Sequence, residues 1–184
     1  MQLSRLSYFA DFFLCPMFAV ALAVVGLFGR DPASLGEWLV AAIVGLITWT
    51  LAEYVIHRSV YHRVQPFQGY HDAHHEDPKA LIGAPSVIGI VLIFAIVFAP
   101  LLPLGLVTAC GVTSGFILGY FAYMMIHHAS HHWNARPGTY LYHLRLHHAR
   151  HHYAHELGNF GVSTAVWDHV FGTALEAQRR TANR

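Results

Sequence analysis

Charge and cysteine are what this 184-residue sequence has least of. Only 11% of its residues are charged, whereas soluble domains carry about 25%, so most of the chain is predicted to avoid water. The formal net charge of +1 is too small to indicate nucleic acid as a partner. Cys15 and Cys110 both lie in apolar stretches and form no C-x-x-C pair, which argues against a disulfide framework or a thiolate metal site.

Several catalytic motifs are also missing. The sequence has no Gly-rich phosphate loop, no G-x-S-x-G and no Glu-x-x-His, so neither a nucleotide site, a serine-elbow hydrolase nor a carboxylate-rich di-iron bundle is indicated. The stretches "HEDPK" at His75 and "HELGN" at His155 begin like H-E-x-x-H but lack its second histidine.

Long apolar runs, by contrast, are abundant, and 55% of the residues are hydrophobic. About 20 helical residues cross the hydrocarbon core of a bilayer. We therefore predict an all-α integral membrane protein, one domain over residues 1–184, with transmembrane helices at about 8–28, 38–56, 80–100 and 104–126.

Two details refine this prediction. The first helix contains Asp11 and Pro16, but no small-residue cleavage site of the A-x-A type follows it, so we expect an uncleaved helix rather than a signal peptide. In the fourth, Gly111, Gly115 and Gly119 are spaced four apart and predict a face that packs closely on a neighbouring helix.

Histidine is the one residue type whose number is unusual and whose side chain is chemically reactive. The chain has 16 histidines, none of them before His57. With four spans, all of them fall on one side of the membrane, in a histidine-rich helical cap at about 57–79 and 127–173. Ten of the 11 lysines and arginines share that side, and only Arg30 is opposite. The positive-inside rule then places the cap and both termini in the cytoplasm, at a bacterial inner membrane or an ER-type membrane.

The spacing of the histidines favours a metal centre. His71, His74 and His75 stand at i, i+3 and i+4, so a helix would point them one way. Neutral imidazole suits zinc, copper, iron and nickel, and ten or more converging histidines suggest two metals. A single histidine is more often a solvated or packing residue, and a histidine-rich tract can be a loose metal-sensing loop. Here Leu144 and Leu146 interrupt the tract, which favours packed structure.

Four clusters in particular, "HRSVYH", "HDAHH", "HHASHH" and "HHARHH", resemble the four histidine boxes of the fatty acid hydroxylase superfamily of membrane di-iron enzymes. The segment "NFGVSTAVWDHVFGT" at 159–173 is similar to the one that follows the last box in fatty acid 2-hydroxylases. The resemblance covers about 53–173 and implies metal ligation by His57, His62, His71, His74, His75, His127, His131, His132, His148, His151 and His152.

His128 and His155 are further ligand candidates beside the boxes. Carboxylates commonly orient ligating imidazoles, and Glu53 and Asp168 are the best placed for that role. Six aromatic residues are candidates for lining a substrate cleft: Trp49, Tyr54, Phe67, Tyr120, Tyr123 and Trp167.

The resemblance implies an oxidoreductase with two iron ions and O₂ as co-substrate. It would insert a hydroxyl into a C–H bond of a membrane lipid or fatty acyl chain, near the acyl carboxyl end at the 2-position. No catalytic residue is expected beyond the metal ligands. Zinc, which has no accessible redox state, would fill the site without supporting the reaction. A lipid or sterol desaturase, or a carotenoid hydroxylase, is the alternative within the superfamily.

Electrons must reach such a site, and no flavin, haem or iron–sulfur motif is present in the sequence. We expect an external donor, a ferredoxin or cytochrome b5 with its reductase, steered by Arg136, Arg145, Arg150, Arg179 and Arg180. Outside the enzymes, a haem b electron carrier would use two to four of the histidines. A metal transporter would need ionisable residues in mid-membrane, where Asp11 is the only deep candidate in the first helix.

Overall fold

Four helical segments are long and apolar enough to cross a membrane, as the sequence predicts. The computed structural model describes residues 2–83 and 86–175, and within these ranges it contains helices and one isolated bridge between Gln2 and Ile82. The spans are α1 (Arg5–Leu27), α2 (Ser34–Ile56) continued by the π-helix η1 (His57–Tyr61), the composite segment Ser86–Leu104, and α6 (Leu106–His132). The composite segment consists of α4 (Ser86–Ile93), η2 (Phe94–Phe98), α5 (Ala99–Leu101) and η3 (Leu102–Leu104).

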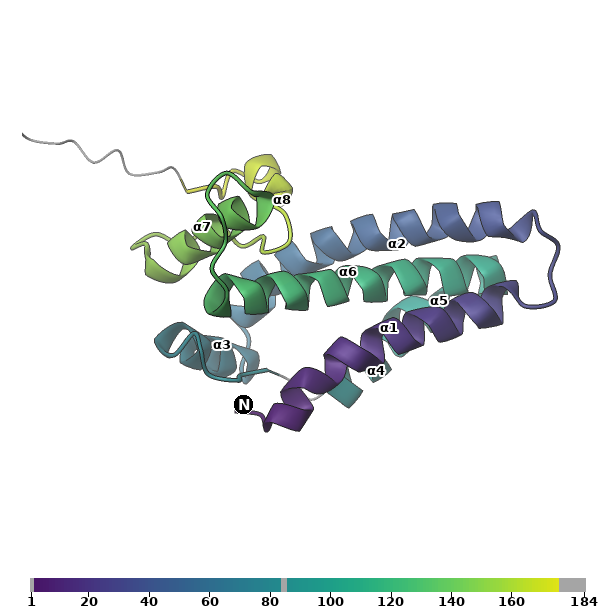
Figure 1. Ribbon diagram of the computed structural model, residues 1–184, viewed down its shortest axis with the longest axis horizontal. Coiled ribbons are helices and arrows are strands. Elements are labelled where there is room, and N and C mark those ends of the chain that lie inside the picture. The colour runs from purple at the N-terminus through teal and green to yellow at the C-terminus, as the bar shows by residue number, and fades with distance from the viewer. Residues whose placement is uncertain (1, 84–85, 176–184) are drawn as a thin grey trace, which may run out of the picture.

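The remaining helices form a cap at one end of the bundle (Figure 1). These are α3 (Phe67–Glu76), α7 (Tyr140–Tyr153) and α8 (Val166–Val170). The Thr139 hydroxyl accepts a hydrogen bond from the backbone N–H of Tyr142 and so caps the start of α7. Every histidine-bearing segment lies at this end, which agrees with the topology predicted from the positions of the spans.

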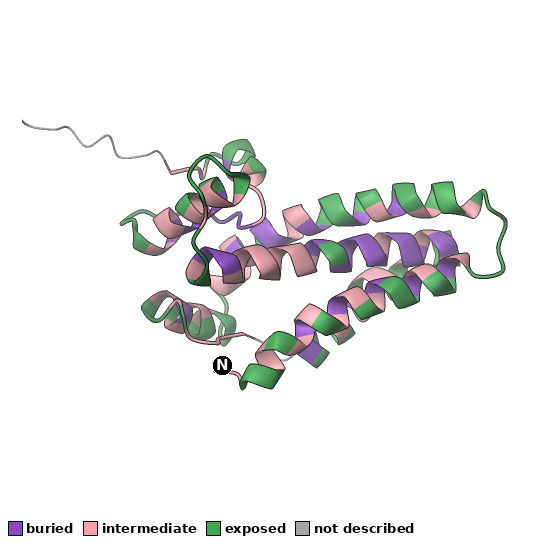
Figure 2. Cartoon of the chain, viewed as in Figure 1, coloured by how far each residue is buried: buried purple, intermediate pink, exposed green. Residues whose placement is uncertain are grey.

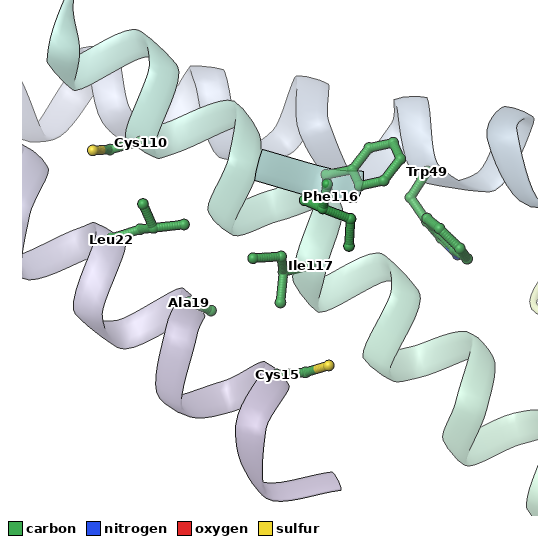
Figure 3. Packing of buried hydrophobic residues seen from close by; sticks show 8 residues of the cluster. Cys15, Ala19, Leu22, Trp49, Cys110, Phe116 and Ile117 are labelled. Carbon is green, nitrogen blue, oxygen red and sulfur yellow. The ribbon is translucent and has the colours of Figure 1, made fainter. Parts of the chain in front are cut away.

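Helix α6 is the central element, packed between α1 and α2 (Figure 3). Its glycine face allows this approach: a Cβ at Gly115 would collide with the backbone carbonyl of Ala42, and one at Gly119 would lie 2.6 Å from the Cβ of Trp49. The close-packing face predicted from the glycine spacing is therefore confirmed. On the other side of α6, Ile117 packs with Cys15, a free and buried thiol.

The outer faces of the bundle are exposed (Figure 2), and many of the exposed side chains there are apolar. Phe13 on α1 is 77% exposed, Val40 on α2 is 64% exposed and Val87 on α4 is 68% exposed. Contiguous apolar surface of this kind marks an interaction site, and on helices of this length the matching environment is lipid.

The observed boundaries differ most from the predicted ones at the last two spans; the first two helices begin at Arg5 and Ser34, three and four residues before the predicted starts. The third helix begins at Ser86 instead of near 80: the backbone N–H of Leu3 donates to the carbonyl of Leu81, 2.8 Å away, so this stretch pairs with the start of the chain. The fourth helix runs six residues beyond the predicted 126 and ends at His132. The histidines at 127–132 are thus carried on the transmembrane helix itself.

Candidate metal centre

Within the described residues, two groups of histidine side chains each offer ligand atoms lying within 4.8 Å of one another. We call them the first and the second group. The first group consists of His74, His127, His131, His148 and His152. The second group consists of His57, His62, His71 and His151. All nine belong to the ligand set predicted from the sequence.

The π-helix explains how the first box contributes two ligands to one group. His57 and His62 are five residues apart, a spacing that an α-helix does not place on one face. In η1 the backbone hydrogen bonds run from i to i+5, and the two imidazole rings stack with centroids 5.3 Å apart. π-Helical turns recur at functional sites, and this one positions both side chains of the box.

Helices α3 and α7 each contribute histidines to both groups. The i, i+3, i+4 spacing places three histidines of each helix on one side, as predicted, but they divide between two centres instead of converging on one. On α3, His71 belongs to the second group and His74 to the first; on α7, His151 belongs to the second group, and His148 and His152 to the first. The two groups are therefore neighbours that share the same helices.

His75 completes the second group. Its Nε2 atom lies 3.0 Å from Nε2 of His71 and 3.1 Å from Nε2 of His151. Its ring also stacks on that of His152 in the first group, with centroids 4.1 Å apart. His75 thus lies where the two groups meet, with its Nε2 directed into the second.

The donor atoms are oriented for a cation. Nδ1 of His57 donates to the carbonyl of Phe160, 2.5 Å away, and Nδ1 of His151 donates to the carbonyl of Gly158, 2.9 Å away. Each ring then keeps its proton on Nδ1 and presents a lone pair at Nε2. The Nε2 atoms of His57 and His71 are 3.0 Å apart, and nitrogen ligands held at about 2.0–2.1 Å from one metal lie roughly 3 Å apart. The site therefore fits a metal ion.

Burial lowers the pKa of several histidines in the two groups and so favours their neutral form. It lowers the pKa of His74 and of His151 to about 3, and that of His152 to about 2, with neighbouring imidazoles adding to the effect. Burial likewise lowers the pKa of His62 to about 4. Metal binding requires the neutral imidazole, so at neutral pH protons do not compete for these nitrogens.

Glu53 and Asp168, predicted to orient the imidazoles, form hydrogen bonds to a loop and to none of the nine imidazoles. Glu53 accepts hydrogen bonds from the backbone N–H groups of Val162 and Ser163, at 2.6 and 2.9 Å, and from the Ser163 hydroxyl. Asp168 accepts from the N–H groups of Phe160 and Gly161, both at 2.8 Å. The two carboxylates thereby hold residues 160–163, and the carbonyl of Phe160 in this stretch accepts from His57. The carbonyl of Gly158, which accepts from His151, lies two residues earlier in the same loop.

Comparison with known proteins identifies this arrangement. The family model for fatty acid hydroxylase matches residues 42–173. The chain belongs to the fatty acid hydroxylase family. It is 35% identical over 146 residues to fatty acid 2-hydroxylase of Homo sapiens (71% of this chain and 38% of that protein). It is also 35% identical over 146 residues to the ceramide very long chain fatty acid hydroxylase scs7 of Schizosaccharomyces pombe (71% and 41%).

A solved structure shows the same fold. It is that of full-length scs7p, with only the hydroxylase domain visible, and it superposes with a TM-score of 0.74 at 24% identity over 94% of this chain and 68% of that one. The chain spans about two-fifths of the length of the curated relatives named above.

Besides His75, three histidines predicted as ligands or ligand candidates lie outside both groups. His132 is exposed and stacks on His128, whose Nδ1 is 3.2 Å from the hydroxyl of Tyr8. His155 is exposed beyond the end of α7. Of the predicted docking arginines, Arg136 is exposed and Arg145 and Arg150 are partly exposed, while Arg179 and Arg180 lie outside the described residues.

Sequence reasoning missed the most important supporting contacts. The carbonyls of Gly158 and Phe160 belong to the backbone, so residue type alone does not indicate their role. The similarity of the 159–173 segment to 2-hydroxylases nevertheless pointed to this region. His147 was also missed: its Nε2 lies 3.0 Å from a carboxylate oxygen of Asp168. Hydrogen bonds from that imidazole, from two backbone N–H groups and from Thr173 lower the pKa of Asp168, although burial alone would raise it.

A cavity of about 180 Å³ adjoins the histidines. Its walls include His71, His74 and His127, and it extends along α1 and α6 among apolar and aromatic side chains. Three of the six aromatic residues predicted to line a cleft do so: Phe67, Tyr120 and Tyr123. Trp49 packs in the bundle core, Tyr54 is hydrogen-bonded to Thr173, and Trp167 donates to Thr50.

Proposed function

We propose that this protein is an O₂-dependent di-iron lipid hydroxylase that adds a hydroxyl to the acyl chain of a membrane lipid. One observation carries the proposal: two adjacent groups of converging imidazoles, each with a member in the wall of the same cavity, lie at one end of a bundle of candidate membrane-spanning helices. The named relatives, which include fatty acid 2-hydroxylases, support the 2-position as the site of reaction.

The ten histidines brought together by the structure are the proposed ligands. The first group would hold one metal, and the second group, with His75 as its fifth member, would hold the other. Iron in both sites would supply the activation of O₂ and the abstraction of hydrogen, which no acid or base can achieve at an unactivated C–H bond. A haem with two axial histidines would need its imidazoles separated by the porphyrin. Rings packed with centroids 4.7 Å apart, as in His57 and His71, leave no such gap.

The chain's own residues position the reactants. Phe67, Tyr70, Tyr123 and Met124 line the cavity next to the histidines and would exclude water from an acyl chain that enters laterally from the bilayer. The carbonyls of Phe160 and Gly158 keep the protons of His57 and His151 on Nδ1, away from the metal. The residues thus hold substrate and ligands, while the metals supply the redox chemistry.

Lipid mass spectrometry tests the proposal. Membrane lipids of cells that express the protein should gain a species heavier by one oxygen atom, and cells expressing His75→Ala should lack it. A species lighter by two hydrogen atoms would instead identify a desaturase. Unchanged lipids in the presence of a competent electron donor would refute both.

We also propose that the cap faces the cytoplasm and receives electrons there. The excess of lysine and arginine on the histidine side supports this orientation. A reporter that works only in the cytoplasm should be active when it is fused after Arg184. If a reporter that works only in the periplasm or the lumen is active there instead, the assigned orientation is reversed.

A further inference from the structure

A row of oxidisable aromatic rings extends from the first group along one face of α6. Tyr123 stacks almost parallel on His127, with centroids 5.6 Å apart and ring planes 10° apart. Tyr120 stacks on Tyr123 in the same way, at 6.4 Å and 20°. Trp49 on α2 contacts both tyrosines, with its centroid 5.1 Å from that of Tyr120 and 5.8 Å from that of Tyr123. Such separations are those of aromatic rings in contact, so a continuous path of rings joins a proposed metal ligand to Tyr120.

The row ends at a proton acceptor. The Tyr120 hydroxyl donates to Oδ2 of Asp11 on α1, 3.3 Å away, and Asp11 is buried. A phenol that loses an electron becomes a strong acid, so its oxidation is easier when a hydrogen-bonded base takes the proton. Among residues 2–83 and 86–175, the structure records a carboxylate bonded to the hydroxyl of Tyr120 and none bonded to that of Tyr123. Of the two tyrosines, Tyr120 is therefore the one that is set up to be oxidised.

This path lies in the wall of the cavity proposed for the acyl chain, which is lined by His127, Tyr123, Tyr120 and Asp11. When the cavity holds no lipid, the oxidisable groups beside the metal centre are the histidines themselves and this row of rings. An oxidising site must exclude competing reactions, and attack on its own ligands would be one. A structural tie between α1 and α6 would explain the bond from Tyr120 to Asp11, but not the row of rings that leads to it. An ionisable residue within a membrane span usually marks a functional site.

The following inference rests on the proposed function. We propose that Tyr120 is a redox-active residue that protects the metal ligands when O₂ reacts in the absence of substrate. Tyr120 gives up one electron, which passes through Tyr123 and His127 and reduces the oxidised metal centre by one electron. The hydroxyl proton of Tyr120 passes to the Asp11 carboxylate, the form that this hydrogen bond stabilises. The products are a neutral tyrosyl radical and a protonated Asp11. The external donor then returns one electron to the radical, and the proton returns from Asp11 to the phenolic oxygen.

EPR spectroscopy of the iron-loaded full chain tests the inference. The protein in detergent, reduced and free of lipid substrate, is mixed with O₂ and frozen at successive times. The wild type should give an organic radical signal, and incorporation of ring-deuterated tyrosine should narrow it. Tyr120→Phe keeps the ring but removes the hydroxyl, so the signal should be lost while the iron content equals that of the wild type. Mass spectrometry of this variant should find more oxidised histidine for the same amount of O₂ consumed.

A second variant and a control separate the proton acceptor from the ring. Asp11→Asn retains an oxygen that accepts the hydrogen bond but does not take up the proton, so the radical should form more slowly and in lower yield. This variant also tests the inference if Tyr120→Phe does not fold. Tyr142→Phe is the matched control, because Tyr142 on α7 lies outside the cavity and beside His143, which belongs to neither group. It should leave the signal unchanged.

The outcomes distinguish this inference from the proposed function. A tyrosine signal that persists in Tyr120→Phe, or a tryptophan signal in its place in the wild type, would overturn the role of Tyr120. Oxidation of the iron by O₂ with no radical in the wild type would overturn it as well, and would leave the proposed function standing. If O₂ leaves the reduced iron unoxidised, the proposed function fails, and the inference fails with it.

Discussion

Nδ1 of His57 and the carbonyl oxygen of Phe160 lie 2.5 Å apart, although 103 residues separate them in the chain. This contact turns the Nε2 lone pair of His57 toward His71, and the equivalent bond from His151 to Gly158 turns the Nε2 of His151 toward His62 and His75. The loop after α7 is therefore part of the candidate metal centre, although none of its side chains belongs to the two groups.

The division of the histidines into proposed metal ligands and histidines outside the two groups can be tested by single substitutions. His75→Ala or His152→Ala should abolish product formation and lower the metal content below the two ions per chain expected for the wild type. His132→Ala and His169→Ala should retain both, because both side chains are exposed outside the groups. Elemental analysis and product formation are the measurements, and zinc in place of iron would still count as occupancy. Metal loss in His132→Ala equal to that in His75→Ala would contradict the grouping.

The Glu53 carboxylate should matter for metal affinity without touching metal. Glu53→Ala leaves the buried N–H of Val162 without its acceptor and frees the loop that holds His57. We expect metal affinity to fall roughly 10- to 100-fold, the usual effect of losing a group that orients a ligand. Competition with a chelator measures this, with the exposed Glu156→Ala as control. Equal affinities in the two variants would show that the loop does not depend on Glu53.

The glycine face of α6 should be intolerant of a methyl group. Gly115→Ala would drive a Cβ into the backbone of Ala42 and should destabilise the fold by about 1–3 kcal/mol through overpacking. Gly36→Ala on α2 is the matched control, because a Cβ there meets nothing within 4 Å and alanine favours a helix. Thermal unfolding in detergent compares them. A melting temperature for Gly115→Ala at or above that of Gly36→Ala would contradict the packing argument.

The need for an external electron donor can be tested with purified protein. It should be inactive with NAD(P)H alone and become active when a reductase with ferredoxin or cytochrome b5 is added. If an acidic donor docks on the cap, charge reversal at Arg145 and Arg150 should slow electron transfer, and higher salt should slow the wild type by screening. Reversal of Arg30, at the other membrane face, is the control. Unchanged transfer rates in a folded Arg145→Glu, Arg150→Glu variant would reject docking but not the need for a donor.

The sequence by itself determined the spans, the common side of the histidines and most of the candidate ligands. Apolar run length predicts helices that cross a membrane because the bilayer has a set thickness, and the i, i+3, i+4 spacing on α3 and α7 predicts a shared helical face. These are local properties of the chain, so no knowledge of its folding is needed. The same is true of the glycine spacing on α6.

Only the tertiary structure decided how the histidines are divided and what holds them. His71 and His74 share a helix but enter different groups, because their partners come from η1, α6 and α7. His132 sits one residue from His131 yet points away, since neighbours on a helix are turned by about 100°. The carbonyls that bond His57 and His151 acquire their role through contacts between separate segments of the chain. Such long-range pairings depend on how the helices pack, which spacing along the chain does not specify.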